Sequence, residues 1–544
     1  AEWFADWSPT FSTELKVSTR DYASLPVVPQ RLPAIGLRFS GALPTGTPSG
    51  VSTNNRFLNF GTENSRHFNE LETKTTDIYL AGTWTRGAHE LKFGIDYADN
   101  EVFNAFLQNI FGNYTFGCES GTYSFGTFSS CDAMTPAQRD LATLENFRNG
   151  RPSSYTVQLP LAGRQIRDGV ANWSYENTGF FLQDNWRVNR NLNVMLGIRV
   201  DKQGVPTKPL ANTAAAAPRV AGSISGNTIV RDSGGFGLDN TQTLDGNTLV
   251  QPRVGFNWNL GTNERRMQVR GGFGLFQGAA ANVWLSNPFS NTGVAIGSFS
   301  CTSFGACNTA NARFGTDPDN PTRLTGQPPA PNIDFISGDL EQPSVWKANL
   351  AFDMELPRLP VVGQLTAGFE WLHTKTESAI YYEQLNLGAP TARGPDGRPL
   401  YYTPQTYNQA CWTGSNFSTT GACAGGRARA LSNPNFNNAF LARRTSQGGG
   451  DSITLSIGQP SLAGLSWNLA FTRTSAQEVS PLTSSTSGSN FGNRSIFDPN
   501  EEALQNSNYL VKDRYTANLA YSRAFVGKYR TTFGVFYEGR KGRP

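Results

Sequence analysis

The sequence predicts an all-β protein, a transmembrane antiparallel β-barrel, and three observations lead to this prediction. Apolar and polar residues alternate over stretches of about ten residues, which is the period of a strand and not of a helix. Short turns join these stretches in pairs, whereas connections of roughly 40 to 80 residues separate the pairs, far beyond ordinary loops. No uninterrupted apolar run is long enough to form a membrane-spanning helix. Strands joined alternately by short turns and long loops are typical of outer-membrane barrels.

Six pairs of alternating stretches follow one another along the chain. In the third pair, Val254, Phe256 and Trp258 alternate with polar residues or glycine, and the pattern resumes after a short turn. The predicted pairs are 77–85 with 90–97, 179–188 with 192–200, 253–260 with 267–273, 346–355 with 365–371, 453–457 with 465–471, and 515–521 with 533–537. Residues 11–19 predict one more strand, and 20–76 hold at least part of another. We therefore expect about 13 strands.

A soluble β-sandwich or propeller would also show alternation, but its strands usually return through short loops at both ends. Here only every second connection is long, as expected when short turns face the periplasm and long loops face outside. Tryptophans in or near the ends of the apolar rows favour the membrane interpretation, because an interfacial girdle would lie there. They are Trp84, Trp186, Trp258, Trp371 and Trp467.

Composition agrees with a barrel and excludes some partners. The chain has 38% hydrophobic residues and a mean hydropathy of −0.40, which a barrel tolerates because its lumen face is polar. The net charge of +4 is spread thinly without a basic tract, so we expect no nucleic-acid partner. No linker divides the chain, and residues 1–544 are predicted to be part of one barrel domain.

The six cysteines form three pairs that are local in sequence, each in a different long connection. The pairs are Cys118 with Cys131, Cys301 with Cys307, and Cys411 with Cys423. This placement predicts three disulfides in an oxidising compartment, each holding a loop that has no core of its own. Metal binding is the alternative, but the spacings are not C-x-x-C and no histidine accompanies a pair. Pairing by proximity is an inference, since other connectivities are possible.

The ends of the chain suggest a fragment. Ala1 begins a segment without the basic and apolar regions of an export signal. The chain ends at Pro544, shortly after a strand, and an odd strand number is unusual for a single-chain barrel. We interpret the chain as an internal piece of a larger barrel, whose signal peptide, other domains and last strands lie outside it.

Several motifs resemble those of one family. They are Gly82-Thr83-Trp84 with His89-Glu90-Leu91-Lys92-Phe93-Gly94, Phe181-Leu182-Gln183-Asp184-Asn185-Trp186, Pro252-Arg253-Val254-Gly255-Phe256, and Phe536-Tyr537-Glu538-Gly539-Arg540 with Gly542-Arg543-Pro544. Together they look like TonB-dependent outer-membrane receptors, and most like the Oar-like group, which carries an N-terminal carboxypeptidase-regulatory-like domain. The resemblance spans residues 11–544. It implies a barrel of roughly 22 strands, occluded by a plug and opened when an energised TonB complex pulls on an N-terminal box.

Catalytic chemistry is not indicated. The three histidines, His67, His89 and His373, are scattered, and no acid, base and nucleophile occur together, so we expect no enzyme and no cofactor. Alternation places charged side chains on the lumen face, where they would contact plug or substrate, although simple solvation or pairing is the alternative. The candidates are Lys92, Arg253, Arg270, Lys347, Asp353, Glu370 and Arg514, with Arg473 and Arg523 placed in the same rows.

Aromatic residues in polar loop sequence are candidates for ligand contact, because such rings stack on sugars and peptides. They are Tyr114, Tyr401, Tyr402, Tyr407 and Trp412. Packing within a large loop is the alternative role.

These observations predict a protein of the bacterial outer membrane with its loops on the extracellular side. The first hypothesis is energised uptake of a large or scarce substrate, such as a glycan, peptide or metal complex. Its partners would be membrane lipid, the TonB complex acting on an N-terminal region outside this chain, and the plug of the full-length protein. The alternative is a surface protein whose loops bind a protein, lipoprotein or matrix; a passive porin is less favoured.

Overall fold

The computed structural model describes residues 1–542 except 53–55, 226–227, 263–264, 325–328, 361–362, 415, 419, 424–427 and 495. Parts of two predicted turns, at 263–264 and 361–362, lie outside the described residues. The motif residues Arg543 and Pro544 lie outside them as well.

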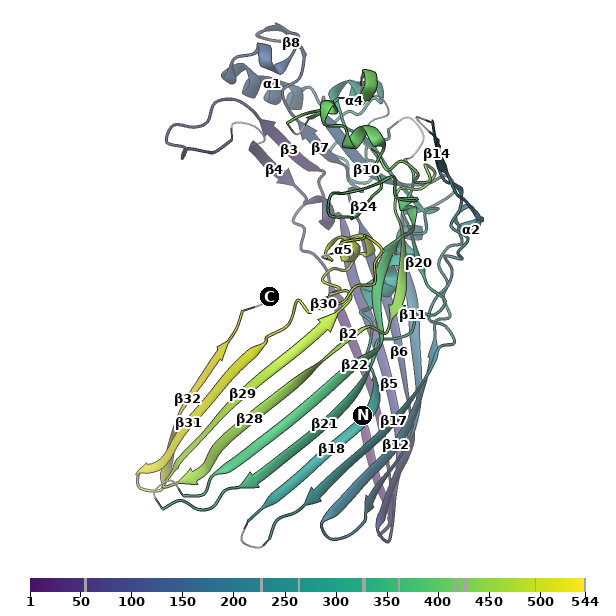
Figure 1. Cartoon of the computed structure of the whole chain (residues 1–544). Coiled ribbons are helices and arrows are strands. Elements are labelled where there is room, and N and C mark those ends of the chain that lie inside the picture. Colours follow the sequence, from purple (N-terminus) through teal and green to yellow (C-terminus); the bar gives the residue numbers. More distant parts are fainter. Residues whose placement is uncertain are drawn as a thin grey trace.

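Fourteen strands of the described chain form an antiparallel sheet in which each strand pairs with the next one along the sequence. They are β1 (Glu2–Ser8), β2 (Phe11–Ser24), β5 (Phe68–Arg86), β6 (His89–Leu107), β11 (Ala171–Arg187), β12 (Leu192–Gly204), β17 (Thr248–Asn259), β18 (Met267–Gln277), β21 (Ser344–Glu355), β22 (Thr366–Gln384), β28 (Gly448–Leu462), β29 (Leu465–Glu478), β31 (Asp513–Val526) and β32 (Tyr529–Arg540). Figure 1 shows a curved wall with tight turns along its lower rim and long connections at its upper end. The predicted antiparallel membrane fold is confirmed.

All six predicted strand pairs are present, but the strand count and lengths differ from the prediction. β1, which is seven residues long, pairs with β2 and was not predicted because the strand is short. β5 and β6 each have 19 residues and continue upward beyond the predicted ranges 77–85 and 90–97. Alternation marks only the part of a strand that has one lipid face, whereas backbone pairing continues above it, where loops cover the strands. In the described chain, β1 pairs only with β2 and β32 only with β31.

Three short strands extend the upper part of this wall into a 17-stranded sheet. β27 (Ala439–Thr445) pairs with the top of β22, β20 (Ile333–Ile336) runs parallel to β27, and β30 (Gln505–Asn506) pairs with β29.

The described residues of the long connections fold together above the wall into what we call the loop assembly (the described parts of 25–67, 108–170, 205–247, 278–343, 385–447 and 479–512). Its largest unit is a five-stranded sheet ordered β19 (Ile296–Cys301), β10 (Ser154–Pro160), β7 (Asn113–Phe116), β3 (Ala34–Phe39) and β4 (Arg56–Gly61). Two-stranded ribbons pair β8 (Gly121–Tyr123) with β9 (Gly126–Phe128), β13 (Arg219–Val220) with β16 (Ser233–Gly234), β14 (Ser223–Ser225) with β15 (Thr228–Val230), β23 (Ala392–Arg393) with β24 (Pro399–Leu400), and β25 (Trp412–Thr413) with β26 (Asn416–Phe417).

The helices of the described chain are short and all lie in the loop assembly. They are α1 (Pro136–Arg148), α2 (Thr213–Ala216), α3 (Asn282–Ser290), α4 (Phe304–Thr309) and α5 (Ser487–Gly492). α1 begins at a capping box in which Thr135 and Gln138 satisfy each other's backbone N–H groups. Within the described residues, no helix combines the length and apolarity needed to cross a membrane.

The loops have hydrophobic cores of their own, which corrects the expectation that only disulfides would hold them. The core of the five-stranded sheet contains the fully buried side chains of Tyr114, Phe116, Tyr155 and Val157. A second cluster surrounds Phe335 and Ile333 of β20. Alternating residues on strands inside the loops supply these cores, so the connections form a folded layer above the wall.

Candidate functional site on the inner face and in the loop assembly

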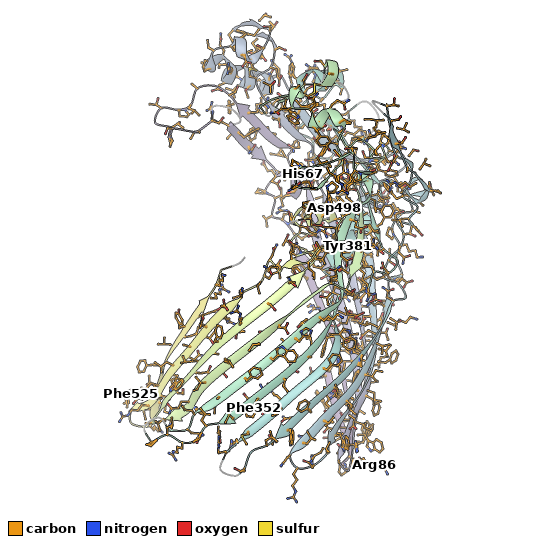
Figure 2. All side chains as sticks on the ribbon, viewed as in Figure 1. His67, Arg86, Phe352, Tyr381, Asp498 and Phe525 are labelled. Atoms are coloured by element: carbon orange, nitrogen blue, oxygen red, sulfur yellow. A yellow bond between two sulfur atoms is a disulfide. The ribbon has the colours of Figure 1, made fainter. Side chains whose placement is uncertain are left out.

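The two faces of the wall differ in chemistry. On β12, Leu196 and Ile198 are each 47% exposed, although they are large and apolar, while the neighbouring Asp201 on the other face is buried. An exposed apolar row of this kind is the lipid-facing side of a membrane strand. We call this side the outer face and the opposite side the inner face. Phe352 lies on the outer face towards the turn end of β21, and Arg86 and Phe525 lie at the turn rim (Figure 2).

The inner face carries a charge network centred on Arg199 of β12. Its Nη1 lies 2.5 Å from Asp96 Oδ2 on β6, and its Nη2 lies 2.5 Å from Asp201 Oδ1. Asp201 also accepts hydrogen bonds from the side-chain amides of Asn177 (2.9 Å) and Gln251. One guanidinium therefore links strands that are not neighbours in the sheet, because β11 lies between β6 and β12.

Gly179 of β11 makes this crossing possible. It lies directly opposite Asp96 on one side and Asp201 on the other. A Cβ at this position would overlap Arg199 Nη2 and lie 2.5 Å from Asp96 Oδ1. Glycine therefore leaves the space through which the Arg199 side chain reaches Asp96.

The predicted lumen residue Lys92 belongs to a second cluster. Its Nζ lies 2.5 Å from Glu14 Oε1, and Lys16 Nζ lies 3.3 Å from the other oxygen of that carboxylate. Both ammonium groups also lie over the ring of Tyr79, at 5.7 and 5.6 Å from its centroid. The charges of this cluster are paired with each other across β2, β5 and β6.

The other predicted lumen residues lie farther along the inner face. Arg253 donates to Gln251 Oε1 (3.2 Å), and its guanidinium carbon lies 4.6 Å from the centroid of Phe276, over which Lys347 also lies at 5.9 Å. Arg270 forms an ion pair with Asp353 and a longer one, at 3.9 Å, with Glu370. Arg514 pairs with Glu538 at 3.0 Å.

Two further residues were assigned to the wrong face. Arg473 alternates in phase with Leu469 and pairs with Ile453, both on the outer face. Arg523 is likewise in phase with the exposed Leu519. Residues two or four positions apart share a face, so neither arginine faces the inner side.

The loop aromatic residues do not share one environment. Tyr114 is completely buried, with its ring stacked 4.2 Å from that of Tyr155, so the suggestion that it contacts ligand is corrected: it packs in the core. Tyr401 is partly buried and donates to Asp498 Oδ1 (3.3 Å); burial, aided by the Asp498 charge, raises its pKa to about 12. Tyr401 thus helps to join two loop segments.

The remaining loop aromatics lie near the third disulfide. Tyr402 and Tyr407 are 44% and 37% exposed, and the backbone N–H of Tyr402 donates to the Tyr407 hydroxyl (2.6 Å). Trp412 Nε1 donates to the carbonyl of Thr406 (2.8 Å), and its ring meets Phe417 edge-on. Tyr402 and Tyr407 therefore present part of their side chains to solvent.

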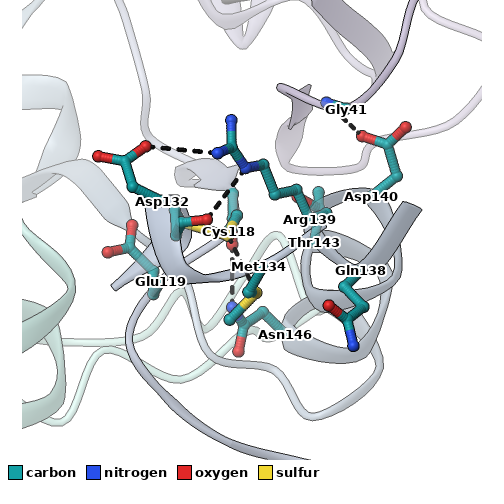
Figure 3. Close-up of a disulfide and its surroundings, with 12 residues drawn as sticks. Gly41, Cys118, Glu119, Asp132, Met134, Gln138, Arg139, Asp140, Thr143 and Asn146 are labelled. Carbon is teal, nitrogen blue, oxygen red and sulfur yellow. Dashed lines mark hydrogen bonds and ion pairs between the residues drawn. A yellow bond between two sulfur atoms is a disulfide. The ribbon is translucent and has the colours of Figure 1, made fainter. Parts of the chain in front are cut away.

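The three predicted disulfides are present, linking Cys118 to Cys131, Cys301 to Cys307 and Cys411 to Cys423. Figure 3 shows the first of them beside α1. Arg139 lies 3.5 Å from Asp132 and donates through Nε to the carbonyl of Cys131 (3.0 Å), while Asn146 Nδ2 donates to Gly117 (2.9 Å). The bridge closes the segment that carries the ribbon β8–β9, and Arg139 and Asn146 of α1 hold the two ends of that segment.

Sequence reasoning missed a buried carboxyl group in the loop assembly. Asp334 of β20 is 2% exposed and accepts hydrogen bonds through Oδ2 from Asn291 (2.7 Å) and Ser487 (3.0 Å). Its Oδ1 and the nearby hydroxyl of Tyr382 are buried without a hydrogen-bond partner. Burial raises the pKa of Asp334 to about 6. No local pattern marks Asp334, because its neighbours Asn291 and Ser487 come from distant segments.

Among the described residues, no three His, Cys, Asp or Glu side chains lie together in a group that could hold a metal ion. His67 is buried near the top of β5 (Figure 2), accepts the backbone N–H of Phe111 at Nδ1 (3.1 Å), and its pKa is lowered by burial. It acts as a structural residue of the loop assembly.

An antiparallel sheet with an apolar outer face and a charged inner face defines the class of membrane β-barrel proteins. The chain belongs to the outer membrane beta barrel domain family, whose model matches residues 5–534. The protein is therefore located in the bacterial outer membrane. A comparison with curated protein sequences gave no match.

Solved structures of outer-membrane transporters are similar to this chain at low identity. The outer membrane transporter YddB from Escherichia coli has 10% identity and a TM-score of 0.43, with 100% of this chain and 56% of that chain covered. The FrpB iron transporter from Neisseria meningitidis has 11% identity and a TM-score of 0.37, with 94% of this chain and 46% of that chain covered. BauA, the ferric preacinetobactin receptor from Acinetobacter baumannii, has 10% identity and a TM-score of 0.36, with 99% of this chain and 51% of that chain covered. The chain spans about half of the length of these chains.

Proposed function

We propose that this chain is part of the barrel of a TonB-dependent receptor of the Oar-like group, which takes up a large or scarce substrate across the outer membrane. The observation that carries the proposal is the pairing of a charged inner face with a folded loop assembly above one end of the wall. A surface of this kind can receive a polar substrate at the loops and offer it a polar wall inside.

The state of the inner charges supports a plugged receptor over an open pore. Lys92, Arg199 and Arg270 each have a carboxylate partner within the wall. A wall of paired charges presents positive and negative groups, together with hydrogen-bond donors and acceptors. Such a surface is complementary to a polar plug domain. The plug, the N-terminal box that TonB would pull and the remaining strands belong to the full-length protein in this proposal.

The loop assembly supports capture on the extracellular side. Its own cores and three disulfides hold the loops in one arrangement, which lowers the conformational entropy that binding would otherwise cost. Enzymatic activity is not part of the proposal.

The test uses the full-length protein, purified from outer membranes. We expect it to bind the isolated periplasmic domain of TonB, measured by calorimetry, and to give no steady conductance in a planar bilayer because the plug fills the lumen. Large steady conductance without TonB binding would reject the proposal in favour of a pore. A silent protein that fails to bind TonB, yet co-purifies stoichiometrically with a surface protein or lipoprotein, would instead support the interaction role.

A further inference from the structure

A cavity of about 620 Å³ lies in the loop assembly, beside the upper end of β6. Its size falls within the range of small-molecule sites. β6 contributes Phe106, β10 contributes Gln158, and β19 contributes Ser298 and Ser300. The segments 329–332 and 428–437 also line it.

The charged side chains that line this cavity all have one sign. Arg231 and Arg429 line it, and none of the described lining residues is Asp or Glu. The rest of the polar lining consists of hydroxyl and amide groups, including Asn291, Asn332 and Asn437. This differs from the inner face below, where Lys92, Arg199 and Arg270 each have a carboxylate partner.

Both arginines are held in place by groups that leave their charge uncompensated. Arg231 donates through Nε to the carbonyl of Ser432 and through Nη2 to its hydroxyl, both at 2.7 Å. Arg429 donates to the carbonyls of Asn386 (3.1 Å) and Asn437 (2.7 Å). Neither guanidinium forms an ion pair with a described carboxylate, and Asp232, next to Arg231 in sequence, pairs with Arg219 at 2.6 Å.

Further features indicate that the site is preorganised and unsaturated. Asn332 Oδ1 accepts from Asn437 Nδ2 and from the backbone of Asn438, both at 3.1 Å, which joins the two segments of the rim. The side-chain oxygen of Gln158 is buried without a hydrogen-bond partner. The pKa of Arg429 is lowered, first by burial and also by the charge of Arg231. Two close cations without a counterion are stabilised when an anion binds between them.

We propose that this cavity binds a small organic anion, with its carboxylate or phosphate group at Arg231 and Arg429 and its polar body against the serine and asparagine lining. The planar guanidinium fork suits oxyanions, and the hydroxyl and amide groups suit a sugar-like or peptide-like body. The inference rests on the proposed function only in treating such an anion as cargo. It names a substrate class for the loop assembly.

The test measures binding to the purified full-length protein, without TonB and without transport. The probes are glucose 6-phosphate and glucuronate, with methyl glucoside as the uncharged control. Binding is measured by calorimetry or saturation-transfer NMR. We expect at least one of the two anions to bind about tenfold or more tightly than methyl glucoside, and its affinity to fall as salt is raised. Equal affinity for the charged and uncharged probes would overturn the proposal.

Variants locate the site. R231Q combined with R429Q is expected to lower anion affinity about tenfold or more, whereas R231K with R429K, which keeps charge but loses the fork, should fall between it and the wild type. R393Q is the matched control, because Arg393 lies outside the cavity and donates to Gly397 (2.9 Å). Unchanged affinity in the glutamine or lysine double variant, with folding confirmed by heat-dependent gel migration, would refute the assignment. Failure of TonB binding in the earlier test leaves this result unaffected.

Discussion

At the scale of single residues, the inner charge network depends on glycine at position 179, which has no side chain. Arg199 reaches Asp96 across β11 only because residue 179 is glycine. Arg199 and Asp96 are far apart in sequence and on strands that do not pair, so the contact is set by sheet register. A small change at position 179 should therefore have a large electrostatic effect.

Gly179→Ala is expected to displace the Arg199 guanidinium and leave Asp96 without its partner. We expect a loss of about 1–3 kcal/mol, since a half-buried charged group loses its hydrogen bonds. The measurement is urea unfolding of the protein in lipid vesicles. Gly197→Ala is the matched control, because a Cβ there meets its nearest neighbour, the carbonyl of Leu182, at an ordinary 3.6 Å. Equal stability of the two variants would show that Arg199 adjusts without cost.

The raised pKa of Asp334 predicts that the stability of the loop assembly depends on pH. Its pKa of about 6 is above the ordinary value of 3.8, so the folded state holds the proton more tightly than the unfolded state. Stability contributed by this group is present below about pH 4 and is lost as pH rises towards 6, by an amount on the order of 3 kcal/mol.

Asp334→Asn should remove this dependence while keeping an oxygen that accepts from Asn291 and Ser487. The measurement is hydrogen exchange of β20, β27 and α5 between pH 4 and 7, corrected for the intrinsic exchange rate. We expect protection to fall with pH in the wild type and to stay level in the variant. Parallel curves would mean that Asp334 does not titrate in this range.

At the scale of elements, each membrane strand separates two environments along one backbone. On β28, Leu455 is 53% exposed on the outer face, whereas the adjacent Thr454 meets Thr472 on the inner face through a hydroxyl contact of 2.9 Å. Both positions are at mid-strand, so they differ in face rather than in depth.

Leu455→Arg is expected to cost about 2–4 kcal/mol, because an arginine is moved into lipid near mid-depth. Thr454→Arg should cost less than half of this, since its side chain enters the polar inner side. Unfolding in vesicles compares the two variants. A larger cost at Thr454 than at Leu455 would reverse the assignment of the faces.

At the scale of the whole molecule, the tight turns and the loop assembly lie at opposite ends of the wall (Figure 1). Gly87, in the turn between β5 and β6, and Gly397, in the turn between β23 and β24, both have positive φ angles of 62° and 83°. A Cβ at either site has nothing within 4 Å, so both turns should accept an inserted peptide.

An epitope tag inserted at each site tests the orientation in the membrane. We expect antibody to label the Gly397 insertion on intact cells and the Gly87 insertion only after the outer membrane is permeabilised, since the loops face outside. Labelling of Gly87 on intact cells would place the turn rim outside and invert the proposed topology.

The sequence by itself determined the six strand pairs, the apolar face of each pair and the three disulfides. Alternation is local and acts within one strand, so Val254, Phe256 and Trp258 identified their face without knowledge of their neighbours. The two cysteines of each disulfide are also close in sequence, so the partner of each cysteine was the nearest other cysteine. These features needed no register between distant segments.

Only the tertiary structure decided what meets across segments. Tyr114 looked like a loop residue open to ligand, yet it lies in a core supplied by Tyr155 and by strands from several loops. Arg231 and Arg429 form one site although nearly two hundred residues separate them. The physical reason is that strand register and loop packing depend on the whole set of pairings, and these bring together residues that no local period connects.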